Sequence, residues 1–129
     1  MRTLGRHLLV ELYGCDAKTI ADVRKIEDVM VGAAKFAKAT IVDVVFHSFS
    51  PHGISGVIVI QESHLTIHTW PEYAFASVDI YTCGSKVNPW RAYQYLAKNF
   101  RARNVTALEM KRGVLNLSGR GRAREVSVV

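Results

Sequence analysis

Residues 61–72 are unusually rich in side chains that can do chemistry. They contain one serine hydroxyl, two imidazoles and two carboxylates, namely Ser63, His64, His68, Glu62 and Glu72. A serine hydroxyl is a weak nucleophile unless a base or a strained geometry activates it. Histidine can take up or give a proton near neutral pH. The segment therefore indicates nucleophilic attack combined with proton transfer.

Ser63 is open to more than one interpretation. No Gly-x-Ser-x-Gly elbow surrounds it, which argues against an ordinary α/β-hydrolase. The pair Glu62–Ser63 instead closes one apolar strand and opens the next. A strained peptide bond at that point could be attacked by the adjacent hydroxyl and become an ester. A plain turn is the alternative, and the residues alone do not decide between a self-cleaving chain, a hydrolase and a turn.

Strand geometry sets a condition on any partnership between Ser63 and His68. Side chains alternate along a strand, so His64, Thr66 and His68 share one face and Ser63 points to the other. Ser63 can therefore meet His68 only if it lies beyond the regular strand, where a turn or a chain break re-aims it.

The two cysteines, Cys15 and Cys83, are too few for a disulfide framework and indicate free thiols in a reducing cytoplasm. Cys83 follows an apolar strand at a strand-to-loop edge, where active-site residues are common. A thiol of ordinary acidity carries a proton at pH 7 and can act as an acid. Cys15 is interpreted as structural. Zinc on Cys83, His64, His68 and His47 is an alternative, but their spacing matches no common zinc motif, and we expect no metal.

Periodicity and turn residues predict the elements that must position these groups. Alternation and β-branched runs predict strands over residues 8–13, 40–49, 54–61, 65–70, 75–82 and 105–110. Helical spacing over 20–37 predicts an amphipathic helix capped by Asp16, and Asn88–Pro89 starts a second helix. Residues 57–60 are apolar at successive positions, which predicts a strand covered on both faces.

The order strand, helix, several strands, helix, strand indicates an α+β two-layer sandwich, a largely antiparallel sheet with two helices on one face. A chain of 129 residues is one domain. The other face of the sheet then needs a cover, for which a homodimer or a higher assembly is simplest. No apolar run is long enough for a membrane span and no secretion signal is visible, so we expect a cytoplasmic protein without membrane contact.

The net charge of +6 suggests some affinity for polyanions. Much of it lies near the C-terminus, at Lys111, Arg112, Arg120, Arg122 and Arg124. We interpret residues 114–129 as a basic tail, with a mobile stretch at 118–124. No aromatic residues interleave with these arginines, as stacking on bases would require, so we expect no nucleic-acid partner.

The segment ESHLTIHTWPE, residues 62–72, resembles the signature of the small prokaryotic S-adenosylmethionine decarboxylases. Three further segments agree with it: GRHLL at 5–9, YGCD at 13–16 and DIYTCG at 79–84. The similarity runs in order from about Gly5 to about Gly113. The resemblance implies one pyruvoyl decarboxylase domain over residues 1–113, which decarboxylates S-adenosylmethionine to the aminopropyl donor for spermidine.

Two other functions remain open beside this resemblance. A pyruvoyl-dependent arginine or ornithine decarboxylase on the same scaffold would keep the same processing residues. A non-enzymatic binding module that kept the fold is a second alternative, although retention of Ser63, His68 and Cys83 argues against it.

The resemblance also implies how the enzyme would mature. The Ser63 hydroxyl would attack the carbonyl of Glu62, Ser55 would assist, and His68 would remove the serine α-proton. The products would be a β chain, residues 1–62, and an α chain, residues 63–129. The α chain would begin with a covalent pyruvoyl group derived from Ser63.

Turnover follows from the same resemblance. The pyruvoyl ketone would condense with the amine of S-adenosylmethionine and accept electrons as carbon dioxide leaves, the role of pyridoxal phosphate elsewhere. Cys83 would then return a proton to the substrate carbon. Glu72 would bind the ribose hydroxyls across a dimer interface, and Phe49 would stack on the adenine.

Overall fold

The computed structural model describes residues 2–115. The strands are β1 (Arg2–Tyr13), β2 (Ile41–Ser48), β3 (Ile54–Ile60), β4 (Ser63–Trp70), β5 (Phe75–Cys83) and β6 (Asn104–Leu115). The helices are α1 (Ala17–Ile20), α2 (Val23–Phe36) and α3 (Pro89–Asn99), with a 3-10 turn, η1 (Pro71–Tyr73).

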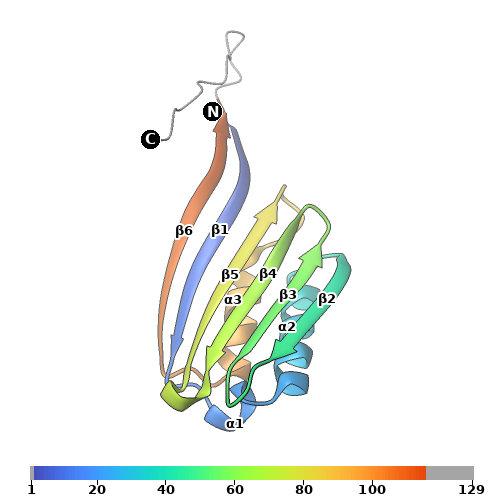
Figure 1. The fold of residues 1–129 in the computed structure, drawn as a ribbon. Coiled ribbons are helices and arrows are strands. Elements are labelled where there is room, and N and C mark those ends of the chain that lie inside the picture. Colours follow the sequence, from blue (N-terminus) through green and yellow to red (C-terminus); the bar gives the residue numbers. More distant parts are fainter. Residues whose placement is uncertain (1, 116–129) are drawn as a thin grey trace, which may run out of the picture.

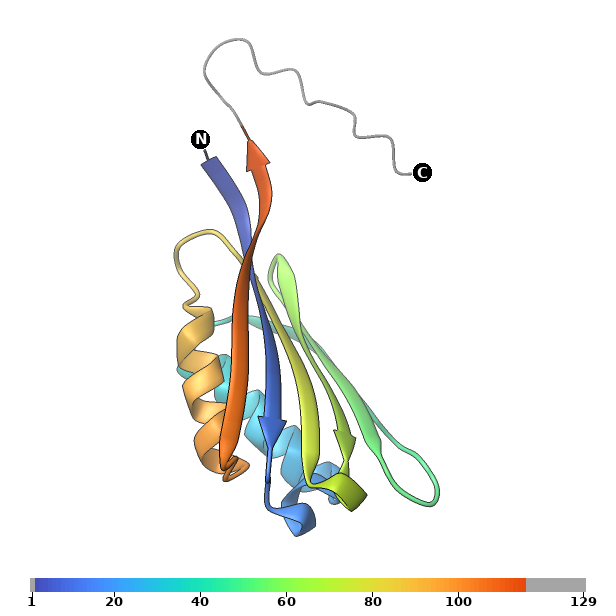
Figure 2. The same cartoon turned by 90° about the vertical axis from the view of Figure 1, so that its left-hand side faces the viewer.

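All six strands form one antiparallel sheet in the order β2-β3-β4-β5-β1-β6. The helices lie together on one of its faces (Figures 1 and 2). The predicted α+β two-layer sandwich is therefore confirmed, with the short α1 as an addition to the two expected helices. None of the helices within residues 2–115 has the length and apolar character to cross a bilayer.

The cap of the main helix differs from the prediction. Asp16 precedes the short α1, and its carboxylate accepts from the Thr19 hydroxyl at 2.6 Å rather than from a helix amide. This hydrogen bond is the main cause that lowers the pKa of Asp16. Asp22 caps α2 instead, accepting from the amides of Arg24 and Lys25 at 3.0 and 3.2 Å. The chain thus breaks once before its long helix begins.

The start of α3 follows the prediction, because the Asn88 side chain accepts from the Trp90 amide at 3.0 Å and Pro89 opens the first turn. Glu109 of β6 then ties this helix to the sheet. It accepts from Arg6 Nη2 at 2.7 Å and from Trp90 Nε1 at 2.8 Å. The hydrogen bond from Arg6, followed by that from Trp90, lowers the pKa of Glu109.

One face of the sheet packs on the helices and the other is open. The covered face and the helices share a core whose fully buried members include Leu8, Ile58, Ile67, Ile80, Met30 and Leu96. In β3, Ile58 and Ile60 are buried, but Val59 between them is 38% exposed. The expectation that residues 57–60 are covered on both faces is therefore wrong for a single chain.

The β3–β4 hairpin runs from one end of the sheet to the other. Ile60 pairs with Ser63 at one end, and Ile54 pairs with Thr69 at the other. Cys83, the last residue of β5, lies at the same end as the β3–β4 turn, the upper end in Figure 1. The loop between β2 and β3 and the η1 turn lie at the lower end.

The last strand extends beyond the predicted domain boundary at residue 113. Thr3 pairs with Val114 and Arg2 pairs with Leu115, so β1 and β6 project as a two-stranded ribbon past the other strands (Figure 1). Residues 116–129, which hold the stretch predicted to be mobile, lie outside the described part of the chain.

Candidate active site

Three of the predicted site residues gather where the β3–β4 turn meets the end of β5. Ser63 Oγ lies 3.2 Å from Cys83 Sγ, and both side chains are half-buried. Glu62, directly before Ser63, has a φ of +72°, the left-handed region that favours glycine. Holding a non-glycine residue there costs about 1–3 kcal/mol. The peptide bond between Glu62 and Ser63 therefore follows a strained residue and lies beside a thiol.

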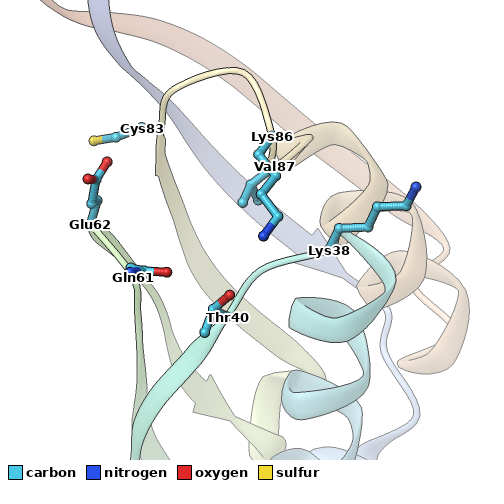
Figure 3. A pocket seen from close by; sticks show the side chains of 7 residues that line it. All are labelled: Lys38, Thr40, Gln61, Glu62, Cys83, Lys86 and Val87. Atoms are coloured by element: carbon cyan, nitrogen blue, oxygen red, sulfur yellow. The ribbon is translucent and has the colours of Figure 1, made fainter.

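Two cavities adjoin this turn. A cavity of about 250 Å³ is lined by Lys38, Thr40, Gln61, Glu62, Cys83, Lys86 and Val87. A second, of about 330 Å³, is lined by Arg2, Thr3, Leu4, Glu62, Cys83 and Gly84. Figure 3 shows the Glu62 carboxylate directed toward the Cys83 thiol at the edge of the first cavity. Cys83 therefore borders both cavities.

The other four predicted residues line one cavity of about 170 Å³ at the opposite end of the hairpin. Ser55 and His68 face each other across β3 and β4, with 2.8 Å between Ser55 Oγ and His68 Nδ1. Glu72 lies in η1, and its Oε2 is 3.8 Å from His52 Nε2. Phe49 stands at the rim with 51% of its surface exposed. This end offers a hydroxyl–imidazole pair, a carboxylate and an aromatic face.

The two groups are far apart within one chain. Ser63 and His68 are separated by five residues of regular strand, a distance of about 17 Å. Ser63 pairs with Ile60 inside the hairpin, so no turn or break re-aims it toward His68. The condition set by the sequence for a direct Ser63–His68 contact is therefore not met in a single copy.

Cys15 and the zinc alternative play no part in this arrangement. Cys15 is only 6% exposed and lies 3.6 Å from the Leu12 carbonyl oxygen, to which its thiol donates. Burial raises the pKa of the Cys15 thiol to about 11, which supports its interpretation as structural. His68 and Cys83 lie at opposite ends of the sheet, and in residues 2–115 no three His, Cys, Asp or Glu side chains are grouped to hold a metal.

A polar network on the open face was not found from the sequence. His7 Nε2 lies 3.0 Å from Asp79 Oδ1, and Arg112 Nη1 lies 3.0 Å from His7 Nδ1. Asp79 also accepts from the Thr66 hydroxyl at 3.1 Å. A guanidinium can only donate, so His7 accepts at Nδ1 and donates from Nε2 to Asp79. These contacts join four strands, and no local spacing signals them.

Comparisons with known proteins agree with this fold and show the family. The sequence model of the S-adenosylmethionine decarboxylase family matches residues 6–113. Two bacterial relatives called S-adenosylmethionine decarboxylase proenzyme are each 56% identical over 115 residues, which is 89% of this chain. They come from Pelotomaculum thermopropionicum and Moorella thermoacetica, and the matches cover 91% and 92% of the relatives.

The solved structure of the adenosylmethionine decarboxylase from Aquifex aeolicus is also similar. Its TM-score is 0.86 at 37% identity, over 92% of this chain and 98% of that one. Fold, site and matches together define the class, which is a decarboxylase built on an α+β sandwich. The chain belongs to the S-adenosylmethionine decarboxylase family, as the resemblance of residues 62–72 predicted. These matches lend no support to the arginine or ornithine alternative.

Proposed function

We propose that this chain is a self-processing S-adenosylmethionine decarboxylase whose prosthetic group is a pyruvoyl group made from Ser63. The position of the Ser63 hydroxyl carries this proposal. Ser63 directly follows Glu62, whose backbone is in the left-handed region, and its hydroxyl lies 3.2 Å from the Cys83 thiol. The hydroxyl that would attack the Glu62 carbonyl thus belongs to the residue directly after the strained Glu62. The word proenzyme in the names of the relatives agrees with a chain that must be processed.

Maturation would consume one water and release one ammonia. The Ser63 oxygen forms an ester with the Glu62 carbonyl carbon as the C–N bond breaks and the nitrogen takes a proton. Removal of the serine α-proton and cleavage of its Cβ–O bond free the Glu62 carboxylate. Water then replaces the nitrogen, which leaves as ammonia, and a ketone remains. Residues 1–62 become the β chain, and the α chain begins at residue 63.

The base for the α-proton then comes from a second copy of the chain. His68 is the assigned base, yet it lies about 17 Å from Ser63 in its own chain. The open face of the sheet carries apolar side chains that are 38–63% exposed, Leu9, Tyr13, Val45, Val59, Leu108 and Met110. A face of this kind is typical of an interface. We therefore infer a homodimer whose open faces pack against each other.

A twofold axis perpendicular to the strands is the arrangement of two open faces that brings the two groups of residues together, whereas an axis parallel to the strands would leave like ends together. Two sheets packed face to face about a twofold axis perpendicular to the strands exchange their ends. The Ser63 end of one copy then lies over the His68 end of the other, and the dimer contains two equivalent composite sites. Each site combines Glu62, Ser63 and Cys83 of one copy with Phe49, Ser55, His68 and Glu72 of the other.

Each residue then has a defined task. Once formed, the pyruvoyl ketone supplies the electron sink for loss of carbon dioxide. The Cys83 thiol donates a proton to the substrate carbon. The Glu72 carboxylate accepts hydrogen bonds from the ribose hydroxyls, and the exposed ring of Phe49 covers the adenine. During maturation the Ser55 hydroxyl, 2.8 Å from Nδ1, holds the imidazole of His68 in place.

The cellular location, the substrate and the extent of the domain are also part of this proposal. Cys15 and Cys83 are both free thiols, which agrees with the cytoplasmic location expected from the sequence. S-adenosylmethionine is the small-molecule partner that we assign. The domain is proposed to comprise the β chain together with the α chain up to the end of β6.

Release of carbon dioxide from carboxyl-labelled S-adenosylmethionine, arginine and ornithine tests this function. Wild-type protein should act on S-adenosylmethionine alone. Cys83→Ala should still be cleaved but lose at least about a hundredfold in turnover, the range for a general acid. Cys15→Ala is the matched cysteine control, and Ser63→Ala should stay uncleaved and inactive. Release from arginine or ornithine only would refute the substrate, and full activity of Ser63→Ala and Cys83→Ala would refute the residue roles.

A further inference from the structure

Glu62 stands between the two cavities at the Ser63 end. Glu62 and Cys83 are the two residues that line both of them. The cavity of about 250 Å³, here called the lysine cavity, opens toward the connection from α2 to β2 and the loop before α3. The cavity of about 330 Å³, here called the ribbon cavity, opens toward the start of β1. The position of Glu62 therefore governs both spaces beside the thiol.

The lysine cavity is lined by two lysines whose ammonium groups are not paired with the Glu62 carboxylate. Lys86 and Lys38 both line it, and within residues 2–115 neither makes an ion pair within 4.0 Å. Figure 3 shows the Lys86 ammonium directed into the cavity toward Thr40, whereas the Lys38 side chain lies at the rim with its ammonium pointing away and would have to turn inward to pair with an anion there. The Glu62 carboxylate points instead toward Cys83 in the uncleaved chain. The cavity is therefore suited to an anion that this chain does not yet present.

Cleavage would create that anion. Under the proposed function, Glu62 becomes a C-terminus with an α-carboxylate in addition to its side-chain carboxylate. The nitrogen of residue 63 leaves as ammonia, so no new ammonium group remains to balance the charge. Two carboxylates beside Cys83 would repel the carboxylate of an incoming substrate. The new end needs a place away from the thiol.

The chain next to Glu62 is already anchored on the wall of the lysine cavity. The Gln61 amide donates to the Thr40 carbonyl oxygen at 2.8 Å, and both residues line that cavity. After cleavage this hydrogen bond would hold Gln61 in place and leave Glu62 as the one released residue. Adjacent Cα atoms are about 3.8 Å apart, so Glu62 can turn into the lysine cavity without displacing a strand.

We propose that the lysine cavity is a receiving site for the cleaved C-terminus of the β chain. Glu62 turns into it after cleavage, and its two carboxylates pair with the ammonium groups of Lys86 and Lys38. The same movement clears the Cys83 side of the ribbon cavity for the substrate. This inference rests on the proposed self-cleavage and adds to it a binding site with defined ligands.

Protection of the new C-terminus from a carboxypeptidase tests the receiving site directly. Processed wild-type protein, Lys86→Gln and the double variant Lys38→Gln/Lys86→Gln are treated with a carboxypeptidase, and loss of Glu62 from the β chain is followed by intact mass. The double variant should be trimmed at least about fivefold faster at low salt, within the range for two partly exposed ion pairs. High salt should speed trimming of the wild type. Lys98→Gln, at the far end of α3, is the matched control.

The outcomes separate this inference from the function on which it rests. Equal trimming of wild type and double variant at low salt would refute the receiving site. The lysines act only after cleavage, so loss of processing in both lysine variants would refute it as well. If wild-type protein shows no β chain at all, the proposed self-cleavage itself fails, and that result is visible before any carboxypeptidase is added.

Discussion

A chain without His68 should be cleaved only when a second copy supplies the imidazole. Within one chain His68 lies about 17 Å from Ser63 along β4. A base must come within about 3 Å of the proton that it removes, so the gap of about 14 Å exceeds anything that side-chain rotation can close. Proton removal from the Ser63 α-carbon is therefore expected to occur between two chains.

Co-expression of tagged His68→Ala with untagged Ser63→Ala tests this geometry. In the heterodimer, one composite site joins the intact Ser63 of the tagged chain to the intact His68 of its partner, and the other site has neither. Random pairing at equal expression places about half of the tagged chains in heterodimers. About half of the tagged chain should therefore be cleaved, and none when it is expressed alone.

Two results would refute the reasoning. Cleavage of His68→Ala expressed alone would show that this imidazole is not the base. Tagged heterodimers that can be isolated but remain uncleaved would show that the two groups of residues are not shared between copies. Tagged Ser63→Ala co-expressed with wild type is the control and should stay intact, since it lacks the attacking hydroxyl.

Three further predictions follow from the contacts of single residues. Alkylation of native protein at about pH 8 should label Cys83 and spare Cys15, whose burial raises its pKa to about 11, and equal labelling would contradict this. In the uncleaved Ser63→Ala background, Asp22→Ala should lower the free energy of unfolding in urea by about 1 kcal/mol through loss of the α2 cap. Glu109→Gln in that background should lower it by about 1 kcal/mol at pH 7. The fold lowers the pKa of Glu109, so this difference in the free energy of unfolding should persist above pH 4.5, the ordinary pKa of a glutamate. It should vanish as the pH falls through the lowered pKa. A difference that stays constant with pH would contradict this prediction.

Local patterns were sufficient for most of the fold. Alternation and β-branched runs marked the six strands, and Asn88–Pro89 marked α3, because these signals act over a few residues. The break between α1 and α2 was missed, since Asp16 and Asp22 are both good caps and only the fold selects Asp22. The apolar run at 57–60 was read as buried on both faces, whereas a single chain covers only the helix side.

The resemblance supplied candidate site residues but not their arrangement in space. The resemblance of residues 62–72 named Ser63 and His68 together, yet a strand places neighbours in sequence far apart in space. Only the register of β3 and β4 shows that they belong to opposite ends of the sheet. Lys38 and Lys86 come from separate loops, and no spacing in the sequence links either of them to Glu62.

Intact mass of the purified protein, before and after a reagent that traps ketones, tests the central claim most directly. Two fragments should appear, residues 1–62 and an α chain lighter by one ammonia than a serine-terminated fragment. The α chain alone should gain the mass of the reagent. A single unbroken chain, or a serine-terminated fragment that does not react, would contradict the conversion of Ser63 to a pyruvoyl group.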